Sequence, residues 1–302
     1  MKGDHETMER KKKKNKKPLI GMIVLFCAIL IVSCVKIADI LFEREKDIED
    51  FQKLTALIES IPSTNRSSEA GGDSKNAPQE IAPKGSEPSV VIPSVSKPGE
   101  TEATEAASAD TASKPVFTRN LQPLFDKNRD CIGWVSISNT SINYPVMHTP
   151  QEPEKYLRKN FDLEYSRSGV PFLQGTHTLD SDNLIIYGHN MQNGTMFSEL
   201  IKYRNKSFAS EHPVIEFETG RGLKLYAVFA VAQIRNSNAW YQFAEASDAA
   251  DFSDRLTAVT KSALYTTGDP PQYGQQLLTL STCYGSSKDD RLIVIAVEKQ
   301  SQ

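Results

Sequence analysis

The sequence predicts a mostly β domain, an antiparallel barrel or sandwich with an embedded helix, that is joined to a membrane helix by a disordered linker. Three observations predict this class. An uncharged apolar segment lies near the N-terminus, a stretch rich in Pro, Ser, Ala, Glu and Lys follows, and short apolar runs alternate with turn residues from about residue 116 onward. That last region has roughly 185 residues, enough for one domain with a sizeable core.

The apolar segment at residues 18–38 follows a lysine-rich tail at residues 1–17. Its uncharged part would span roughly 27 Å as a helix, close to the ~30 Å thickness of a hydrocarbon core. The lysines predict a cytoplasmic N-terminus and an extracytoplasmic domain, with the lipid bilayer as a partner. A cleaved signal peptide and a lipoprotein signal at residues 31–34 are alternatives, and both also place the domain outside the membrane.

Two segments separate the membrane from the domain. Residues 39–61 are typical of a juxtamembrane amphipathic helix, and the pattern leaves open whether it continues the membrane helix or self-associates. Residues 62–115 contain seven prolines and no apolar periodicity, so they cannot bury enough surface to offset the entropy of ordering. We expect a disordered linker that gives reach to a domain at residues 116–302.

Seven apolar runs in the domain are typical of short strands: residues 132–137, 142–147, 183–187, 214–218, 224–231, 276–280 and 291–297. A short helix is expected before Asn128 and a longer one over residues 246–265. Turn residues between the runs favour a mostly antiparallel barrel or sandwich.

Composition excludes several function classes. The formal net charge is −3 with mixed signs, so no nucleic-acid partner is expected. No Cys-x-x-Cys or His-x-x-x-His spacing occurs, so we expect neither a metal nor another cofactor. Of the four cysteines, Cys27 and Cys34 lie in the apolar segment. Cys131 and Cys283 could in principle form a disulfide, but we interpret Cys131 as a core residue.

Two apolar runs end in residues that can carry chemistry. Cys283 ends one run and Arg291 opens the next, so a hairpin would bring the guanidinium near the thiol. A nearby cation favours the reactive thiolate and could bind an oxyanion. His189 follows the run at residues 183–187 through Gly188. A Cys–His pair at two strand ends is the minimum for nucleophilic acyl transfer.

These motifs resemble the sortase family. Residues 279–283, Thr-Leu-Ser-Thr-Cys, are similar to its Thr-Leu-x-Thr-Cys signature, and Arg291 follows at the family's spacing. Residues 187–191 followed by residues 194–200 are similar to its histidine motif in the class B form. The resemblance covers roughly residues 117–298. It implies an eight-stranded sortase β-barrel with an N-terminal helix and a helix between strands six and seven.

The resemblance also implies a mechanism and its partners. Cys283 would attack a threonine carbonyl in the C-terminal sorting signal of a secreted protein, and His189 would protonate the leaving amine. An amine of a peptidoglycan precursor would then resolve the thioacyl enzyme. Arg291 would steady the oxyanion. Further substrate-binding or oxyanion groups are expected at Ser281, Thr282 and Tyr284, the last through a backbone N–H.

Three other functions remain as alternatives. The barrel could polymerise pilins, although the only Asp-Pro pair, Asp269-Pro270, lies far from the N-terminal lid of class C sortases. It could also hydrolyse its target as a cysteine endopeptidase. A non-enzymatic surface scaffold is the third alternative, and selective labelling of Cys283 by a thiol reagent would count against it.

Overall fold

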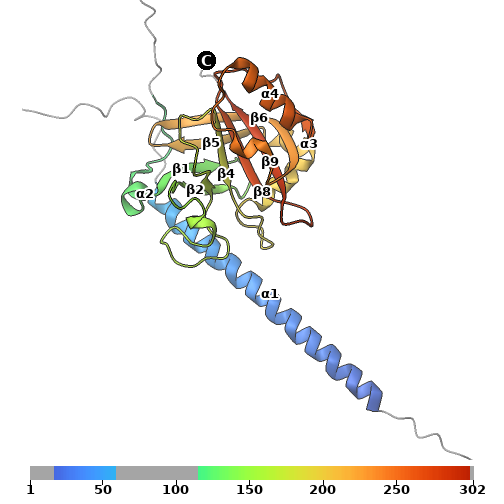
Figure 1. Cartoon of the computed structure of the whole chain (residues 1–302). Helices are drawn as coiled ribbons and strands as arrows, with labels where there is room; N and C mark the ends of the chain where they lie inside the picture. Colours follow the sequence, from blue (N-terminus) through green and yellow to red (C-terminus); the bar gives the residue numbers. More distant parts are fainter. Residues whose placement is uncertain (1–16, 59–114, 300–302) are drawn as a thin grey trace, which may run out of the picture.

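The computed structural model describes residues 17–58 and 115–299 of the 302-residue chain. The expected cytoplasmic tail at 1–17 and linker at 62–115 lie outside the described residues, apart from Lys17 and Pro115. A long helix projects from one side of a β-rich domain (Figure 1).

The long helix α1 (Lys17–Leu57) joins the predicted membrane segment and the predicted amphipathic helix without a break. Among the described residues it is the one helix long and apolar enough to span a membrane. Its apolar side chains from Met22 to Phe42 are exposed, whereas Leu54 and Ile58 at its end are buried against the domain. The helix therefore continues outward from the apolar segment and ends on the domain surface.

Nine strands in the described residues form one sheet, in the order β5-β1-β2-β3-β4-β8-β9-β6-β7. Because β5 also pairs with β6, eight of them close into a ring, and β7 is added to the outer edge of β6. The predicted eight-stranded barrel is confirmed. The strands are β1 (Cys131–Ser136), β2 (Asn143–Met147), β3 (Phe172–Leu173), β4 (Asn183–Tyr187), β5 (Val214–Thr219), β6 (Gly222–Arg235), β7 (Ala263–Thr266), β8 (Leu277–Cys283) and β9 (Asp290–Glu298).

The short helices lie between the strands: α2 (Gln122–Lys127), η2 (Lys155–Leu157), η3 (Ser198–Arg204), α3 (Lys206–Glu211), η4 (Ala239–Gln242) and α4 (Ala249–Thr260). The helix expected at 246–265 is confirmed between β6 and β7, but it is shorter. The Asp248 side chain caps its N-terminus by accepting from two backbone N–H groups. Its predicted end is wrong because residues 263–266 alternate in exposure and pair with β6 as β7.

Two of the three core clusters in the described residues lie on opposite faces of β8 and β9, because both strands are buried on both faces. Leu278 and Leu280 point into the barrel, where they join a cluster from β1, β2, β4, β5, β6 and β9. Leu277 points outward and packs with Trp240 and Phe252 from η4 and α4. The segment between β6 and β7 therefore covers the outer face of β8 and β9. The carboxyl end of β8 and the amino end of β9, where Cys283 lies opposite Arg291, form the site.

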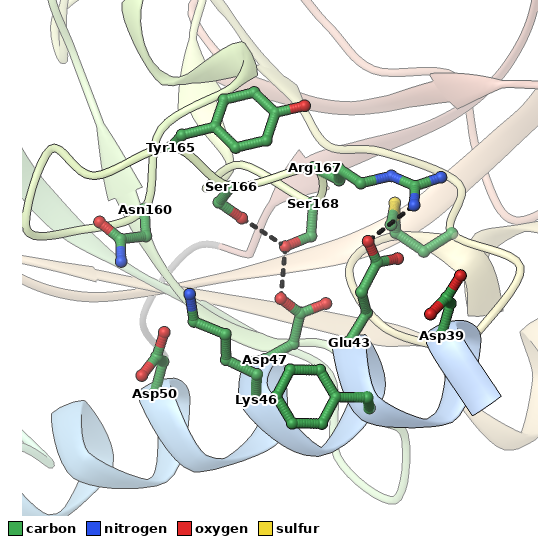
Figure 2. A pocket seen from close by; sticks show the side chains of 12 residues that line it. Asp39, Glu43, Lys46, Asp47, Asp50, Asn160, Tyr165, Ser166, Arg167 and Ser168 are labelled. Atoms are coloured by element: carbon green, nitrogen blue, oxygen red, sulfur yellow. Dashed lines mark hydrogen bonds and ion pairs between the residues drawn. The ribbon is translucent and has the colours of Figure 1, made fainter.

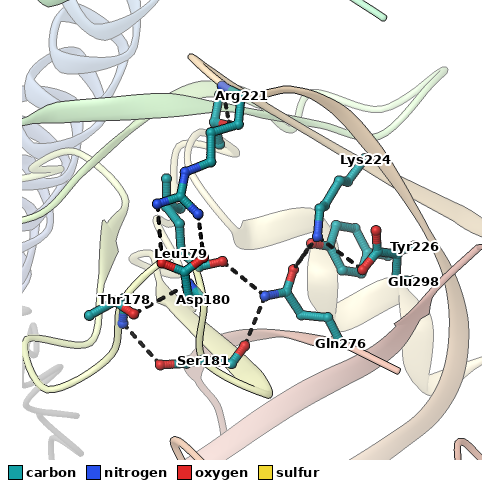
Figure 3. A network of polar contacts seen from close by, with 10 residues as sticks. Thr178, Leu179, Asp180, Ser181, Arg221, Lys224, Tyr226, Gln276 and Glu298 are labelled. Carbon is teal, nitrogen blue, oxygen red and sulfur yellow. Dashed lines mark hydrogen bonds and ion pairs between the residues drawn. The ribbon is translucent and has the colours of Figure 1, made fainter. Parts of the chain in front are cut away.

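A polar network fixes the opposite ends of β4, β8 and β9 (Figure 3). Gln276, just before β8, donates from Nε2 to the carbonyls of Leu179 (3.0 Å) and Ser181 (2.8 Å), just before β4. Lys224 of β6 donates to Gln276 Oε1 and to Glu298, both at 3.0 Å. The network holds β8 in register beside β4.

Candidate active site

The order of three neighbouring strands brings the predicted site residues to one edge of the sheet. β4 and β8 run parallel, with Tyr187 opposite Ser281. β8 and β9 run antiparallel, with Cys283 opposite Arg291. The carboxyl ends of β4 and β8 therefore meet the amino end of β9, and His189 lies two residues beyond β4 at the same edge.

His189, Cys283 and Arg291 all line one open cavity of about 470 Å³. Its walls include Tyr241 of η4 and Gln174, which follows β3. The three residues singled out from the sequence thus belong to one site, although they come from segments about a hundred residues apart in the chain.

Cys283 is a free, exposed thiol at the end of β8. It lies on the outward-facing side of the strand, in phase with Thr279 and Ser281. Cys131 is also free but buried, and burial raises the pKa of its thiol to about 12. The structure therefore contains no Cys131–Cys283 disulfide, and the interpretation of Cys131 as a core residue is confirmed.

The outward-facing hydroxyls of Thr279 and Ser281, which precede Cys283 on β8, bind side chains of η4. Trp240 Nε1 donates to Thr279 Oγ1 at 3.1 Å, and the Ser281 Oγ and Tyr241 hydroxyl groups are 2.8 Å apart. The ring of Tyr241 also stacks on Tyr187 of β4, with 5.7 Å between ring centroids. The hydroxyl-rich pattern before the thiol thus positions η4 beside the cavity.

His189 is held by the loop that carries it and by a second loop. Its Nε2 lies 2.9 Å from the carbonyl oxygen of Leu157, and its own carbonyl accepts from Phe197 N–H at 2.8 Å. Burial lowers the pKa of the imidazole below its ordinary value. The hydrogen bond to Leu157 acts in the opposite direction, whereas the positive charge of Arg158 lowers the pKa further.

Gly188 joins β4 to His189, and packing requires it to lack a side chain. A Cβ at this position would lie 2.5 Å from the ring of Phe197. The Gly188 N–H donates to the Ser281 carbonyl (3.1 Å), and its carbonyl accepts from Thr282 Oγ1 (2.8 Å). These bonds extend the β4–β8 pairing past the end of β4.

We expect Gly188→Ala to displace Phe197 or the His189 loop, because the added methyl group would overlap a fully buried ring. The change should lower the free energy of unfolding by about 1–3 kcal/mol, as for other overpacked cores. Denaturant unfolding monitored by circular dichroism measures this effect. Gly220→Ala is the control for inserting a methyl group, since its Cβ would meet only the ring of Phe125 at an ordinary 3.5 Å. Equal stability of Gly188→Ala and the wild type would contradict the packing role.

Arg291 is half-buried, and its guanidinium bonds to its own hairpin. Nη1 donates to the carbonyls of Lys288 (2.6 Å), in the loop between β8 and β9, and of Asp290 (3.0 Å), the first residue of β9. Both acceptors are backbone carbonyls, and among the described residues the guanidinium forms no ion pair with a carboxylate. Its charge is available to an anionic group in the cavity.

The three remaining predicted site residues have structural partners. Ser281 and Thr282 are buried and use their hydroxyls as described above. The backbone N–H of Tyr284 donates to the Asp290 carbonyl at 3.1 Å and closes the hairpin. Their roles in substrate or oxyanion binding stay predictions.

Sequence reasoning missed two residues that join the parts of the site. Leu157 contributes only its carbonyl, which no side-chain pattern could reveal. Asn190 Nδ2 donates to the Cys283 carbonyl at 3.1 Å and ties the histidine loop to the cysteine strand. Its position next to His189 is a signal that could have found it.

Comparison with known proteins gives a consistent result. The family model described as the Sortase domain matches residues 135–299. Sortase B of Listeria monocytogenes is 35% identical over 167 residues, which cover 55% of this chain and 66% of that protein. Sortase B of Staphylococcus aureus is 28% identical over 185 residues, which cover 59% of this chain and 75% of that protein. The solved Staphylococcus aureus sortase B–substrate complex matches with a TM-score of 0.56 and 27% identity, covering 60% of this chain and 85% of the other.

The barrel, its cysteine-histidine-arginine edge and the family match over more than half of the chain lead to one conclusion: the chain belongs to the sortase family of cysteine transpeptidases. Within that family it is a class B sortase, as the similar proteins and structures are. The resemblance inferred from its motifs is confirmed.

Proposed function

We propose that this protein is a membrane-anchored transpeptidase that cleaves a Thr–x bond in the C-terminal sorting signal of secreted proteins and transfers them to a cell-wall amine. Cys283 is the nucleophile, His189 the proton carrier and Arg291 the oxyanion-binding group. The observation that carries the proposal is the β4-β8-β9 order, which gathers these three residues around one cavity.

Acylation begins with the Cys283 thiolate. Its Sγ attacks the threonine carbonyl carbon, a C–S bond forms, and the carbonyl electrons move to oxygen. The Arg291 guanidinium stabilises that oxyanion by charge. When the carbonyl re-forms, the C–N bond breaks and protonated His189 gives its proton to the leaving amine. A thioester and the released C-terminal fragment result.

Transfer reverses these roles. The incoming amine attacks the thioester carbon, and neutral His189 accepts a proton from the attacking nitrogen. Collapse of the second tetrahedral intermediate breaks the C–S bond and restores the thiolate. The product is an amide between the secreted protein and the acceptor, and His189 is protonated again for the next cycle.

The anchored topology is supported by the length and apolar exposed surface of α1. We infer that the N-terminus is cytoplasmic because lysines precede the apolar segment. The end of α1 packs on the domain through Leu54 and Ile58, and this contact supports a site that lies outside the membrane and near its surface.

The test uses the full chain in detergent micelles with a fluorogenic sorting-signal peptide. We expect cleavage with a ligated product when a short peptide amine that resembles a cell-wall cross-bridge is added. Cleavage without any ligated product at saturating amine would overturn the transpeptidase proposal in favour of hydrolysis. Ligation only to a pilin lysine peptide would instead replace the cell-wall acceptor by pilus assembly.

The pH dependence should follow the charge beside His189. Since its proton is needed for the leaving amine, kcat/KM should fall as pH rises through the imidazole pKa. Arg158 lowers that pKa, so Arg158→Gln should raise it and move the high-pH limb of the profile to higher pH. The shift should be small, about 0.2–0.5 pH units, because the Arg158 charge is exposed to solvent and screened. Arg158→Lys keeps the charge and should leave the limb in place. A downward shift in Arg158→Gln would contradict this electrostatic role.

A further inference from the structure

The part of α1 beyond the predicted membrane span lies against two loops of the catalytic domain (Figure 2). One is the loop after β4, residues 188–197, which carries His189. The other is the loop after η2, residues 158–170. A single carboxylate of α1, that of Asp47, bonds to both.

Asp47 accepts hydrogen bonds from three side chains. Ser168 Oγ donates to Oδ1 at 2.6 Å, and Asn193 Nδ2 donates to Oδ2 at 3.3 Å. Thr195 Oγ1 shares its single hydrogen between Oδ2 at 3.2 Å and Asn193 Oδ1 at 2.7 Å. These donors are 3%, 9% and 5% exposed, respectively. A carboxylate that receives buried donors from two loops fixes the position of one loop relative to the other.

The first loop leads directly from Asp47 to the imidazole. Asn193 and Thr195 lie at its tip, and an isolated bridge between Asn190 and Met196 narrows its base. Below that bridge, Phe197 N–H bonds to the carbonyl of His189. A shift of the tip is therefore transmitted to the residue that moves the proton.

The second loop supplies the acceptor for the imidazole. Ser166 and Ser168 share a hydrogen bond of 2.8 Å, and Ser166 N–H donates to the Arg158 carbonyl at 3.0 Å. Leu157, the neighbouring residue, presents its carbonyl to His189 Nε2. The contact of Asp47 with Ser168 therefore reaches the same imidazole from the other side.

An apolar contact one helical turn later supports the same loop. Phe51 packs edge-on against Tyr144 of β2, with 4.9 Å between ring centroids. The Tyr144 hydroxyl accepts from Met196 N–H at 2.9 Å. Met196 has a φ of 57°, a left-handed conformation that a non-glycine residue adopts only when its surroundings hold it.

We propose that Asp47 is a positioning residue: through it, α1 holds the two loops that set the place of His189, so that the membrane helix completes the active site. The proposal rests on the proposed role of His189 in proton transfer. Asp47 touches neither substrate nor the reacting atoms.

The test compares full-length Asp47→Ala, Asp47→Asn and wild type in micelles. We expect Asp47→Ala to lower kcat about tenfold with KM changed less than about twofold, since a misplaced proton carrier slows the chemical step. Asp47→Asn keeps an acceptor for Ser168 and should lose less. Glu45→Gln removes a charge from the exposed face of the same helix and should behave as wild type.

A readout independent of activity reports on His189 directly. Diethyl pyrocarbonate modification, mapped by mass spectrometry, should be several-fold faster at His189 in Asp47→Ala and unchanged at His212. An unchanged rate at His189 overturns the positioning role, whatever the activity. The positioning role is also overturned if kcat falls equally in Asp47→Ala and Asp47→Asn and His212 is modified faster in both. Faster modification of both histidines would signal general unfolding. A third outcome separates the two proposals. If the wild type transfers no peptide to amine, but His189 is modified faster in Asp47→Ala than in the wild type, the proposed function fails and the positioning role stands.

Discussion

Cys283→Ala and His189→Ala should each abolish ligation of a sorting-signal peptide to an amine, with kcat/KM lowered by at least about 10⁴-fold for the cysteine variant. No other described side chain on this edge of the sheet offers a thiolate, and the second domain thiol, Cys131, is buried with a raised pKa. The measurement is product formation by chromatography with the full-length variants.

The matched control is Cys131→Ala, which removes a thiol from the core. We expect it to retain activity close to that of the wild type, after correction for the folded fraction. Circular dichroism of the Cys283→Ala variant should be unchanged, because its side chain is exposed. Residual ligation above about 1% of the wild-type rate in a folded Cys283→Ala variant would remove Cys283 from the mechanism.

Arg291→Ala should lower kcat about 10²–10³-fold with little change in KM, as expected for the loss of one oxyanion-stabilising donor. Arg291→Lys should recover part of that loss, since it keeps the charge but not the planar fork. Steady-state kinetics with the fluorogenic peptide measure both. The loss of kcat in Arg291→Ala should exceed what any unfolded fraction explains. Among the described residues the Arg291 guanidinium bonds only to carbonyls of its own hairpin, so its removal should change the free energy of unfolding little.

Arg235→Ala is the matched control for removing a guanidinium from the same region. Arg235 is on β6 and pairs with Asp290 of β9, and the side chain of Arg235 is 68% exposed. It should leave kcat within about twofold of the wild type, as surface substitutions commonly do. If Arg235→Ala and Arg291→Ala lost activity equally, the effect would come from the charge of the region and not from a specific contact.

Much of the fold could be predicted because its signals are local. The strand at 183–187 is found with its predicted bounds, and each of the other six predicted runs overlaps a strand with different bounds. β3 escapes prediction because two residues carry no periodicity. The helix predicted at 246–265 is too long because residues 263–266 are as apolar as a helix face, and only pairing with β6 makes them a strand.

The sequence allowed the catalytic residues to be predicted, but it did not allow the arrangement of the contacts around them to be predicted. Cys283 and Arg291 are joined by a hairpin, a local feature that the sequence spacing indicates. The neighbourhood of His189 depends on the parallel pairing of β4 with β8, which connects residues 94 positions apart (Tyr187 and Ser281). Such pairing is set by the whole topology. The contacts of Asp47 are of the same kind, since one acid among many on an amphipathic helix carries no mark of its partners.

The most direct test of the proposed chemistry is intact-mass spectrometry of the full chain incubated with a sorting-signal peptide in the absence of amine. We expect a covalent adduct with the mass of the peptide up to its threonine, mapped to Cys283, and its discharge to ligated product when amine is added. Absence of the adduct in the wild type under turnover conditions, or the same adduct in Cys283→Ala, would contradict a thioacyl intermediate on Cys283.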